Sequence, residues 1–267
     1  MAMIPPMTDE RDLELYRQFR GQFQDGSDLG LKPAPYPKLF LDDETIDGTA
    51  MVYCEMASDT LRELANAVNE FRRYITQLDA WRPVYDAASD DEQYSLLLDH
   101  IRPIAHHCLN APYSIRGRII NATCFVSLFA GRFVKWPQKR PDWRGKHADM
   151  KTAKRLASAW SSWPTLASAL GAMNGEDFCL ATGNFRDDHH HGHPRSVGMG
   201  HVWGVHRVSG EREGWSFASY PPLAIADLIP LLCTEHHRVR AAFDAYYALL
   251  QEQAESVPRR TRAIATE

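Results

Sequence analysis

The chain has 267 residues, a formal net charge of −4, 44% hydrophobic residues and 24% charged residues. That length can bury a substantial core in one large domain or two modest ones. The negative charge excludes a globally basic nucleic-acid coat but permits a local basic site. Five widely spaced cysteines without a C-x-x-C pair favour reduced thiols over a disulfide framework or a zinc ribbon. With no signal peptide and no long apolar run, we expect a cytoplasmic protein without membrane segments.

The first part of the chain, residues 1–57, predicts a helix followed by a loop. Residues 8–24 begin with a cap and acidic residues and continue with apolar residues at helical spacing. Residues 26–37 are interrupted by glycine and proline, which predicts a loop. Residues 40–57 are compatible with a short strand or with the beginning of a helix, and the sequence leaves both open.

A helical bundle is predicted over residues 58–257. An apolar stripe at intervals of three and four runs through residues 58–78 and predicts its first helix. A capping box at Ser89 begins a second helix, which is expected to end at Pro103. Pro112 then opens a third helix that is apolar nearly all round, and this is typical of a central helix in a bundle.

The middle of the chain contains a connector and two more helices. Residues 135–147 hold prolines, tryptophans and basic residues, and two halves of the bundle are expected to meet near them. Residues 150–160 predict a helix that is kinked or divided at Pro164. A further helix is expected to start at Gly175 and to run into a histidine cluster, ending at the break over residues 192–194.

The C-terminal part predicts a β-hairpin and one more helix. Residues 201–208 and 215–220 flank a polar tip, which indicates the hairpin. Pro221 introduces the last helix, and residues 258–267 predict a polar, frayed tail. The predicted fold class is therefore mainly α, a helical bundle of about seven to nine helices with one small β-hairpin before the C-terminal helix.

The segment from Asn184 to Arg195 holds the densest group of ionisable residues. Four of the 12 histidines lie within five positions, behind an arginine and two aspartates. On a helix, Arg186 and His190 share a face because they are four residues apart, and His191 lies a further 100° round. Three interpretations of this cluster compete.

The first interpretation is a metal-dependent enzyme that uses the cluster from His189 to His206. Several histidines are potential metal ligands, and Asp187 and Asp188 are close to them in the sequence. Adjacent histidines on a helix, however, point to different faces. The helical spacing of zinc enzymes, two histidines four apart with a glutamate between them, does not occur here.

The second interpretation is acid/base chemistry on a phosphodiester, and the third is structural. An imidazole moves protons near neutral pH, and the Arg186 guanidinium can stabilise charge on a phosphate oxygen. Such a site can cleave RNA without a metal, because the 2′-hydroxyl of the substrate is the nucleophile. In the structural reading, Arg186 and Asp187 close a salt-bridged helix end, and the protein is a non-catalytic helical protein-interaction module.

The string from Arg186 to His191 resembles the R-[N/D/H]-x-x-x-H motif of HEPN domains, which are helical bundles of bacterial toxins, defence systems and RNA-processing enzymes. The resemblance implies metal-independent ribonuclease activity without a cofactor, with Arg186 and His191 catalytic and Asp187 supporting them. It also implies a homodimer whose two motifs face a shared cleft. We add His190 to the candidate catalytic residues. The wider segment is similar to a poorly characterised group of bacterial all-helical proteins.

Further arginines complete the predicted site. Arg195 and, on the central helix, Arg116 and Arg118 are candidate substrate-binding residues, with Arg102 and His106 upstream of the latter pair. The alternative is that Arg116 and Arg118 pair with acids such as Asp99 or Glu92. A second histidine pair, within residues 235–238, predicts a polar helix face rather than a ligand set.

Overall fold

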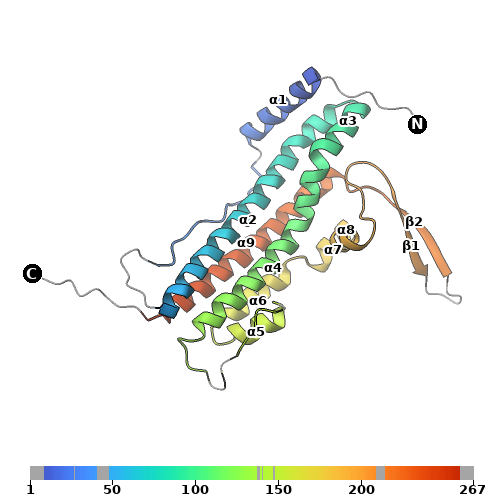
Figure 1. Ribbon diagram of the computed structural model, residues 1–267. Helices are drawn as coiled ribbons and strands as arrows, with labels where there is room; N and C mark the ends of the chain where they lie inside the picture. Colours follow the sequence, from blue (N-terminus) through green and yellow to red (C-terminus); the bar gives the residue numbers. More distant parts are fainter. Residues whose placement is uncertain are drawn as a thin grey trace, which may run out of the picture. The chain divides into compact units, whose positions relative to one another are not determined.

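A computed structural model describes residues 9–26, 28–40, 48–136, 139, 141–146, 148–208 and 214–258. Its chain is mainly α-helical, which confirms the predicted fold class (Figure 1). Within the described ranges, no helix is both long enough and apolar enough to span a bilayer.

The helices differ widely in length, from the five residues of one π-helical turn to the 40 residues of α2. They are α1 (Asp9–Asp25), α2 (Gly48–Ala87), α3 (Asp90–Leu96), the π-helical turn η1 (Leu97–Ile101), α4 (Arg102–Ala130), α5 (Met150–Ala157), α6 (Trp163–Ala172), α7 (Glu176–Thr182), α8 (Phe185–His191) and α9 (Ile225–Glu255). Two strands, β1 (Val202–Val208) and β2 (Gly214–Tyr220), pair antiparallel with Val205 opposite Phe217. The predicted tip between them, residues 209–213, lies outside the described residues, as does the predicted tail from residue 259 onward.

Contacts divide the described residues into two compact units, and neither unit is a continuous part of the chain. The first unit comprises the described residues of Met1–Leu31, Phe71–Ala111 and Asn174–His236. The second comprises those of Lys32–Glu70, Pro112–Met173 and His237–Glu267. The long helices α2, α4 and α9 therefore each supply residues to both units.

In the first unit, α1 is held by an aromatic stack and an ion pair. The ring of Trp81 on α2 lies between Phe19 of α1 and His100 of η1, with centroid distances of 4.2 and 4.6 Å and nearly parallel planes. The Arg11 Nε donates to Glu92 Oε1 at 2.6 Å. Glu92 also accepts from the backbone and the hydroxyl of Ser89, so the predicted capping box is present and one carboxylate both begins α3 and binds α1.

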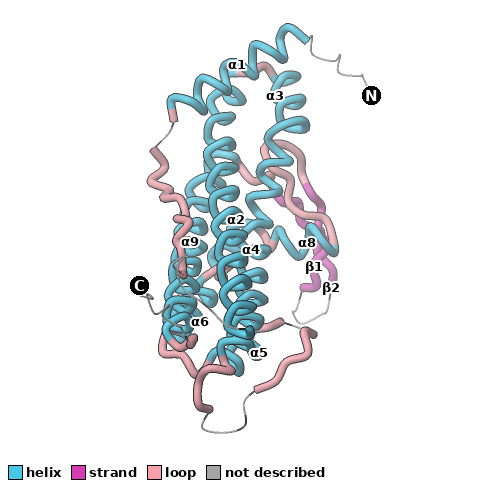
Figure 2. Tube along the Cα trace, turned by 60° about the vertical axis from the view of Figure 1, so that its left-hand side comes forward, coloured by secondary structure: helices cyan, strands magenta, loops and turns pink. Residues whose placement is uncertain are grey.

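In the second unit, buried polar groups connect α2, α4 and α9, which Figure 2 shows running alongside one another there. The Tyr53 hydroxyl of α2 donates to the Leu250 carbonyl of α9 at 3.3 Å, and Gln253 Nε2 donates to Ser127 Oγ of α4 at 2.9 Å. Every partner in these bonds is almost completely excluded from solvent. Bonds of this kind set the register of the helices, because a slip would leave buried polar atoms unpaired.

Two of the predicted helix boundaries are wrong: Pro103 does not end the second predicted helix, and Pro112 does not begin the third. Pro103 lies in the first turn of α4, directly after η1, and Pro112 lies inside α4. The π turn before Pro103 is closed by the Arg102 N–H, which donates to the Leu97 carbonyl five residues back, and α4 continues from there. At Pro112 the buried apolar face of α4, with Ile115 and Ile119, outweighs the single lost bond.

Three other helix predictions concern the beginning of α2, the fourth predicted helix and the last helix. Residues 48–57, which the sequence left open, form the beginning of α2, so this helix starts before the predicted residue 58. The predicted fourth helix is divided into α5 and α6 by residues 158–162, and Pro164 lies in the first turn of α6. The last helix is confirmed as α9.

Candidate functional site

The histidine cluster lies on a short helix of its own, α8, within the first unit. The prediction of one helix from Gly175 into the cluster is wrong, because Gly183 and Asn184 both adopt left-handed conformations with φ of 67° and 57°. Gly183 caps α7, its N–H bonding to the carbonyls of Cys179 and Leu180. The chain therefore turns between α7 and α8, and α8 is not a continuation of α7.

The predicted end of this helix is confirmed. Gly192 is the C-cap of α8, and its N–H donates to the Asp188 carbonyl at 2.8 Å. His191 is thus the last helical residue, whereas His193 lies beyond the helix. The R-x-x-x-x-H spacing from Arg186 to His191 is contained within one continuous helical segment.

A buried aromatic contact anchors α8. Phe185, the first residue of the helix, is 1% exposed. Its ring stacks on His189 at a centroid distance of 5.5 Å and an interplanar angle of 14°. His106 of α4 packs against both, 5.1 Å from the Phe185 ring and 5.4 Å from the His189 ring. This three-ring cluster, Phe185, His189 and His106, fixes one side of α8 against α4.

In contrast to the buried Phe185, the four predicted catalytic residues are all exposed: Arg186, Asp187, His190 and His191. The Arg186 guanidinium donates to Asp187 Oδ1 at 3.4 Å, and the Asn184 amide donates to Asp187 Oδ2 at 3.2 Å. Asp187 is therefore in contact with the guanidinium of Arg186, one of the residues that it is predicted to support. The rings of His190 and His191 lie 6.3 Å apart. The structure thus brings these four side chains together on one exposed helical segment.

The sequence indicated His106 only as a basic residue upstream of Arg116 and Arg118. The structure places it in the three-ring cluster with Phe185 and His189. Burial lowers the pKa of its imidazole below the usual value, and the nearby cationic forms of His189 and Arg102 lower it further. A neutral His106 ring suits its packing against Phe185. The sequence signal for this role is the spacing of Arg102 and His106, four residues apart on one face of α4.

Arg102 holds the segment that follows α8. Its guanidinium donates to the Met199 carbonyl at 2.9 Å and to the Val197 carbonyl at 3.5 Å. Gly198, with φ of 75°, lies so close to Leu97 that a Cβ there would come within 2.6 Å of the leucine side chain. One face of η1 and α4 therefore holds both α8 and the segment after it.

The predicted substrate-binding arginines have different surroundings. Arg195 donates to the Pro221 carbonyl through Nε and Nη2, and to the Ala181 carbonyl through Nη1, so it connects the segment after α8 to the end of α7 and the residues before α9. In the second unit, Arg116 Nε donates to the Leu170 carbonyl at 2.8 Å, whereas Arg118 is exposed and lines a groove. The suggested partner Glu92 pairs with Arg11 instead.

Two further expectations about histidines can be compared with the structure. Across the described residues, no three His, Cys, Asp or Glu side chains converge in a way that could hold a metal ion. The prediction of a polar helix face at residues 235–238 is wrong for its first two members, since Glu235 and His236 are fully buried. Glu235 Oε1 accepts the Asn174 N–H at 2.6 Å, which connects α9 to the residues that precede α7. Nothing in the local pattern distinguishes this buried carboxylate from an exposed one.

The chain was compared with protein-family models, with characterised proteins and with solved structures, and none of the three comparisons gave a significant match.

Proposed function

We propose that α8 is the RNA-contacting face of a metal-independent endoribonuclease of the HEPN-like kind, with Arg186 and His191 as its principal catalytic residues. The observation that carries the proposal is the joint exposure of Arg186, Asp187, His190 and His191 on a helix whose other side is anchored by buried Phe185. An exposed and anchored surface of this kind is accessible to a macromolecular substrate.

The chemistry needs only groups that this helix carries. An imidazole, His191, takes the proton from the 2′-hydroxyl of a ribose, and that oxygen attacks the adjacent phosphorus. The bond from phosphorus to the 5′-oxygen breaks, and His190 supplies the proton that the leaving oxygen requires. The products are a 2′,3′-cyclic phosphate and a 5′-hydroxyl. Arg186 stabilises the charge on the non-bridging oxygens, and Asp187 orients its guanidinium.

A homodimer belongs to the same proposal. Two α8 helices facing one another supply a pair of guanidinium groups to one RNA strand. The two guanidinium groups form a local cationic site on a dimer whose formal net charge is −8, twice the −4 of one chain, and such a local site can bind a polyanion although the net charge is negative. Sedimentation or light scattering on the purified chain measures the dimer directly.

The test is RNA cleavage by the purified full chain in the presence of a chelator. We expect wild type to produce fragments with 2′,3′-cyclic phosphate ends, and Arg186→Ala or His191→Ala to reduce the rate by about 100-fold. A substrate with a single 2′-deoxy position should resist cleavage at that position, because the nucleophile is missing. The matched control is His193→Ala, which removes an exposed imidazole just outside α8 and should leave the rate unchanged.

Equal cleavage by wild type and His191→Ala refutes the catalytic role. Loss of RNA binding in Arg186→Ala without any cleavage by wild type also refutes it, and identifies α8 as a binding surface. Circular dichroism of each variant separates these outcomes from unfolding.

A further inference from the structure

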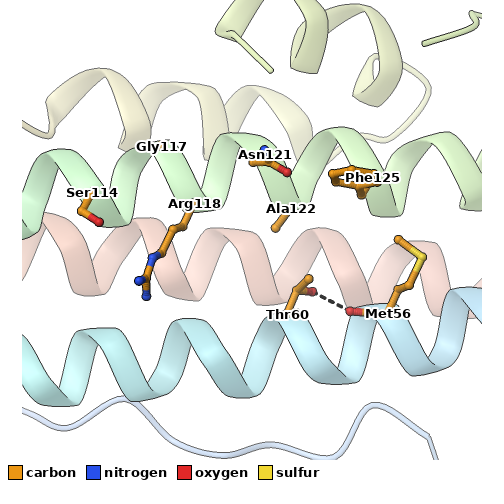
Figure 3. Close-up of a pocket in the computed structure, with 8 residues that line it drawn as sticks. All are labelled: Met56, Thr60, Ser114, Gly117, Arg118, Asn121, Ala122 and Phe125. Carbon is orange, nitrogen blue, oxygen red and sulfur yellow. Dashed lines mark hydrogen bonds between the residues drawn. The ribbon is translucent and has the colours of Figure 1, made fainter. Parts of the chain in front are cut away.

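A groove of about 590 Å³ lies within the second unit, between α2 and α4 (Figure 3). Eight side chains or backbone positions line it, most of them from one face of α4: Ser114, Gly117, Arg118, Asn121, Ala122 and Phe125, with Met56 and Thr60 from α2. Its volume is within the range of roughly 300–1,000 Å³ that is usual for small-molecule sites. None of these residues belongs to the site on α8.

The groove exists because the helix faces that border it carry small side chains at its centre. A Cβ at Gly117 would meet no atom within 4 Å, and Ala122 is the next small residue along α4. The hydroxyl of Thr60 is already engaged, since it donates to the Met56 carbonyl at 2.8 Å and lies 2.8 Å from the buried Tyr246 hydroxyl. The centre of the groove is therefore open, and the exposed amide of Asn121 is the polar group that borders it beside Ala122.

The two ends of the groove differ in character. Figure 3 shows Ser114 and Arg118 toward one end, and Met56 and Phe125 at the other. The ring of Trp143, from the connector after α4, packs edge-on against Phe125 at a centroid distance of 4.8 Å. From Ser114 to Phe125 the helix rises roughly 16 Å, at about 1.5 Å per residue. The groove thus combines one cationic, hydroxyl-bearing end with a longer stretch that is mostly apolar and is bordered by the Asn121 amide.

We propose that this groove binds a single-chain amphiphile with one negative charge, a long-chain fatty carboxylate. The carboxylate binds the Arg118 guanidinium, which presents paired N–H donors in the geometry that a carboxylate accepts. The alkyl chain lies over Gly117 and Ala122 and ends against Phe125 and Met56. One guanidinium at the groove matches one negative charge. Its neighbour Arg116 donates to the Leu170 carbonyl through Nε and does not line the groove.

The experiment measures binding of cis-parinaric acid, a fluorescent 18-carbon carboxylate, to the delipidated full chain below the micelle concentration. Its methyl ester is the neutral probe of the same shape. We expect the acid to bind about tenfold or more tightly than the ester, because hydrogen bonds to a charged group contribute more than those to a neutral one. Oleate should displace the acid, and oleyl alcohol should displace it less well.

Two variants place the ligand in the groove. Arg118→Gln should remove the preference for acid over ester while leaving the ester affinity nearly unchanged. Gly117→Leu fills the centre of the groove and should weaken both probes by about tenfold or more; it should still fold, because leucine is a better helix former than glycine. Arg73→Gln, an exposed arginine of α2 outside the groove lining, is the matched control.

Three results overturn the proposal: absence of saturable acid binding, equal affinity of wild type for acid and ester, or full binding by Gly117→Leu. A wild-type chain that is dimeric but becomes monomeric in Gly117→Leu, without fatty-acid binding, would instead assign the groove to a second copy of the chain.

Discussion

The rings of Phe185 and His189 lie stacked one turn apart on α8, with centroids 5.5 Å apart and 14° between their planes. The first ring is buried, and His106 of α4 packs against both. His189 is therefore part of the support of α8, and its neighbours His190 and His191 are left for chemistry at the exposed face. All three histidines of the run are exposed, and His189 alone also stacks on Phe185 and packs against His106.

Phe185→Ala tests this support. Removing a buried phenylalanine ring costs about 3–5 kcal/mol, through lost transfer free energy and the cavity that remains, and Phe185→Leu should cost less. We expect the urea midpoint of Phe185→Ala to fall sharply. The control is Leu180→Ala on α7, which is 73% exposed and should change the free energy of unfolding by less than about 0.5 kcal/mol. Similar losses in the two variants contradict the anchoring role of Phe185.

Gly183→Ala tests the turn between α7 and α8. The alanine must adopt a φ of 67°, and its Cβ would lie 2.6 Å from Cδ of Arg195, whose guanidinium is tied to the carbonyls of Pro221 and Ala181. We expect a loss of about 1–2 kcal/mol in the free energy of unfolding, measured by chemical denaturation. Gly21→Ala in α1, where a Cβ meets nothing within 4 Å, should instead stabilise by about 0.5–1 kcal/mol. If both substitutions change the free energy of unfolding in the same direction, the turn does not require glycine at position 183.

The helical fold class was predictable because most of its signals are local. The apolar stripe beginning near Ser58, the capping box at Ser89 and the glycine that ends α8 each depend on residues within a few positions. Such patterns survive folding because the tertiary structure uses the same faces that they define. That Arg186, His190 and His191 lie on one helical segment was predictable for the same reason, whereas their exposure was not.

The features that the sequence did not reveal depend on distant partners. Pro112 remains within α4 because burial of that helix outweighs the local preference of proline, and only the packed structure shows this. The local sequence indicates that Glu235 is a polar surface residue. Its hydrogen bond from the Asn174 N–H, which is distant in the chain, appears only in the folded structure. Gly183 and Asn184 were readable as a break in principle, since glycine and asparagine tolerate left-handed conformations, but the apolar spacing across them indicated one continuous helix.

The ion pair of α1 with α3 predicts a pH dependence. Hydrogen bonds from Arg11 and then from Ser89 hold the pKa of Glu92 at about 2, below its ordinary value of 4.5. Since the folded pKa is the lower one, the stabilisation is complete above about pH 4.5 and is lost as the pH falls toward 2. Glu92→Gln should therefore lower the Tm by a few degrees at pH 7 and converge with wild type near pH 2. Glu10→Gln, exposed on α1, is the control. Parallel Tm curves for wild type and Glu92→Gln contradict the prediction.

The last prediction concerns the buried carboxylate of α9. Glu235 is fully buried, and its Oε1 accepts the N–H of Asn174, whose left-handed backbone precedes α7. Glu235→Leu removes this acceptor and leaves the amide without it, so we expect a loss of about 1–3 kcal/mol in the free energy of unfolding. Glu235→Gln keeps an acceptor oxygen and should lose less.

Hydrogen exchange at the Asn174 amide should accelerate in the leucine variant, because the opening is local to the start of α7. Thr234→Val, one residue away, removes only an exposed hydroxyl that bonds to the Pro230 carbonyl of its own helix, and it should leave that exchange rate unchanged. Unaltered exchange in Glu235→Leu shows that α9 does not hold the beginning of α7.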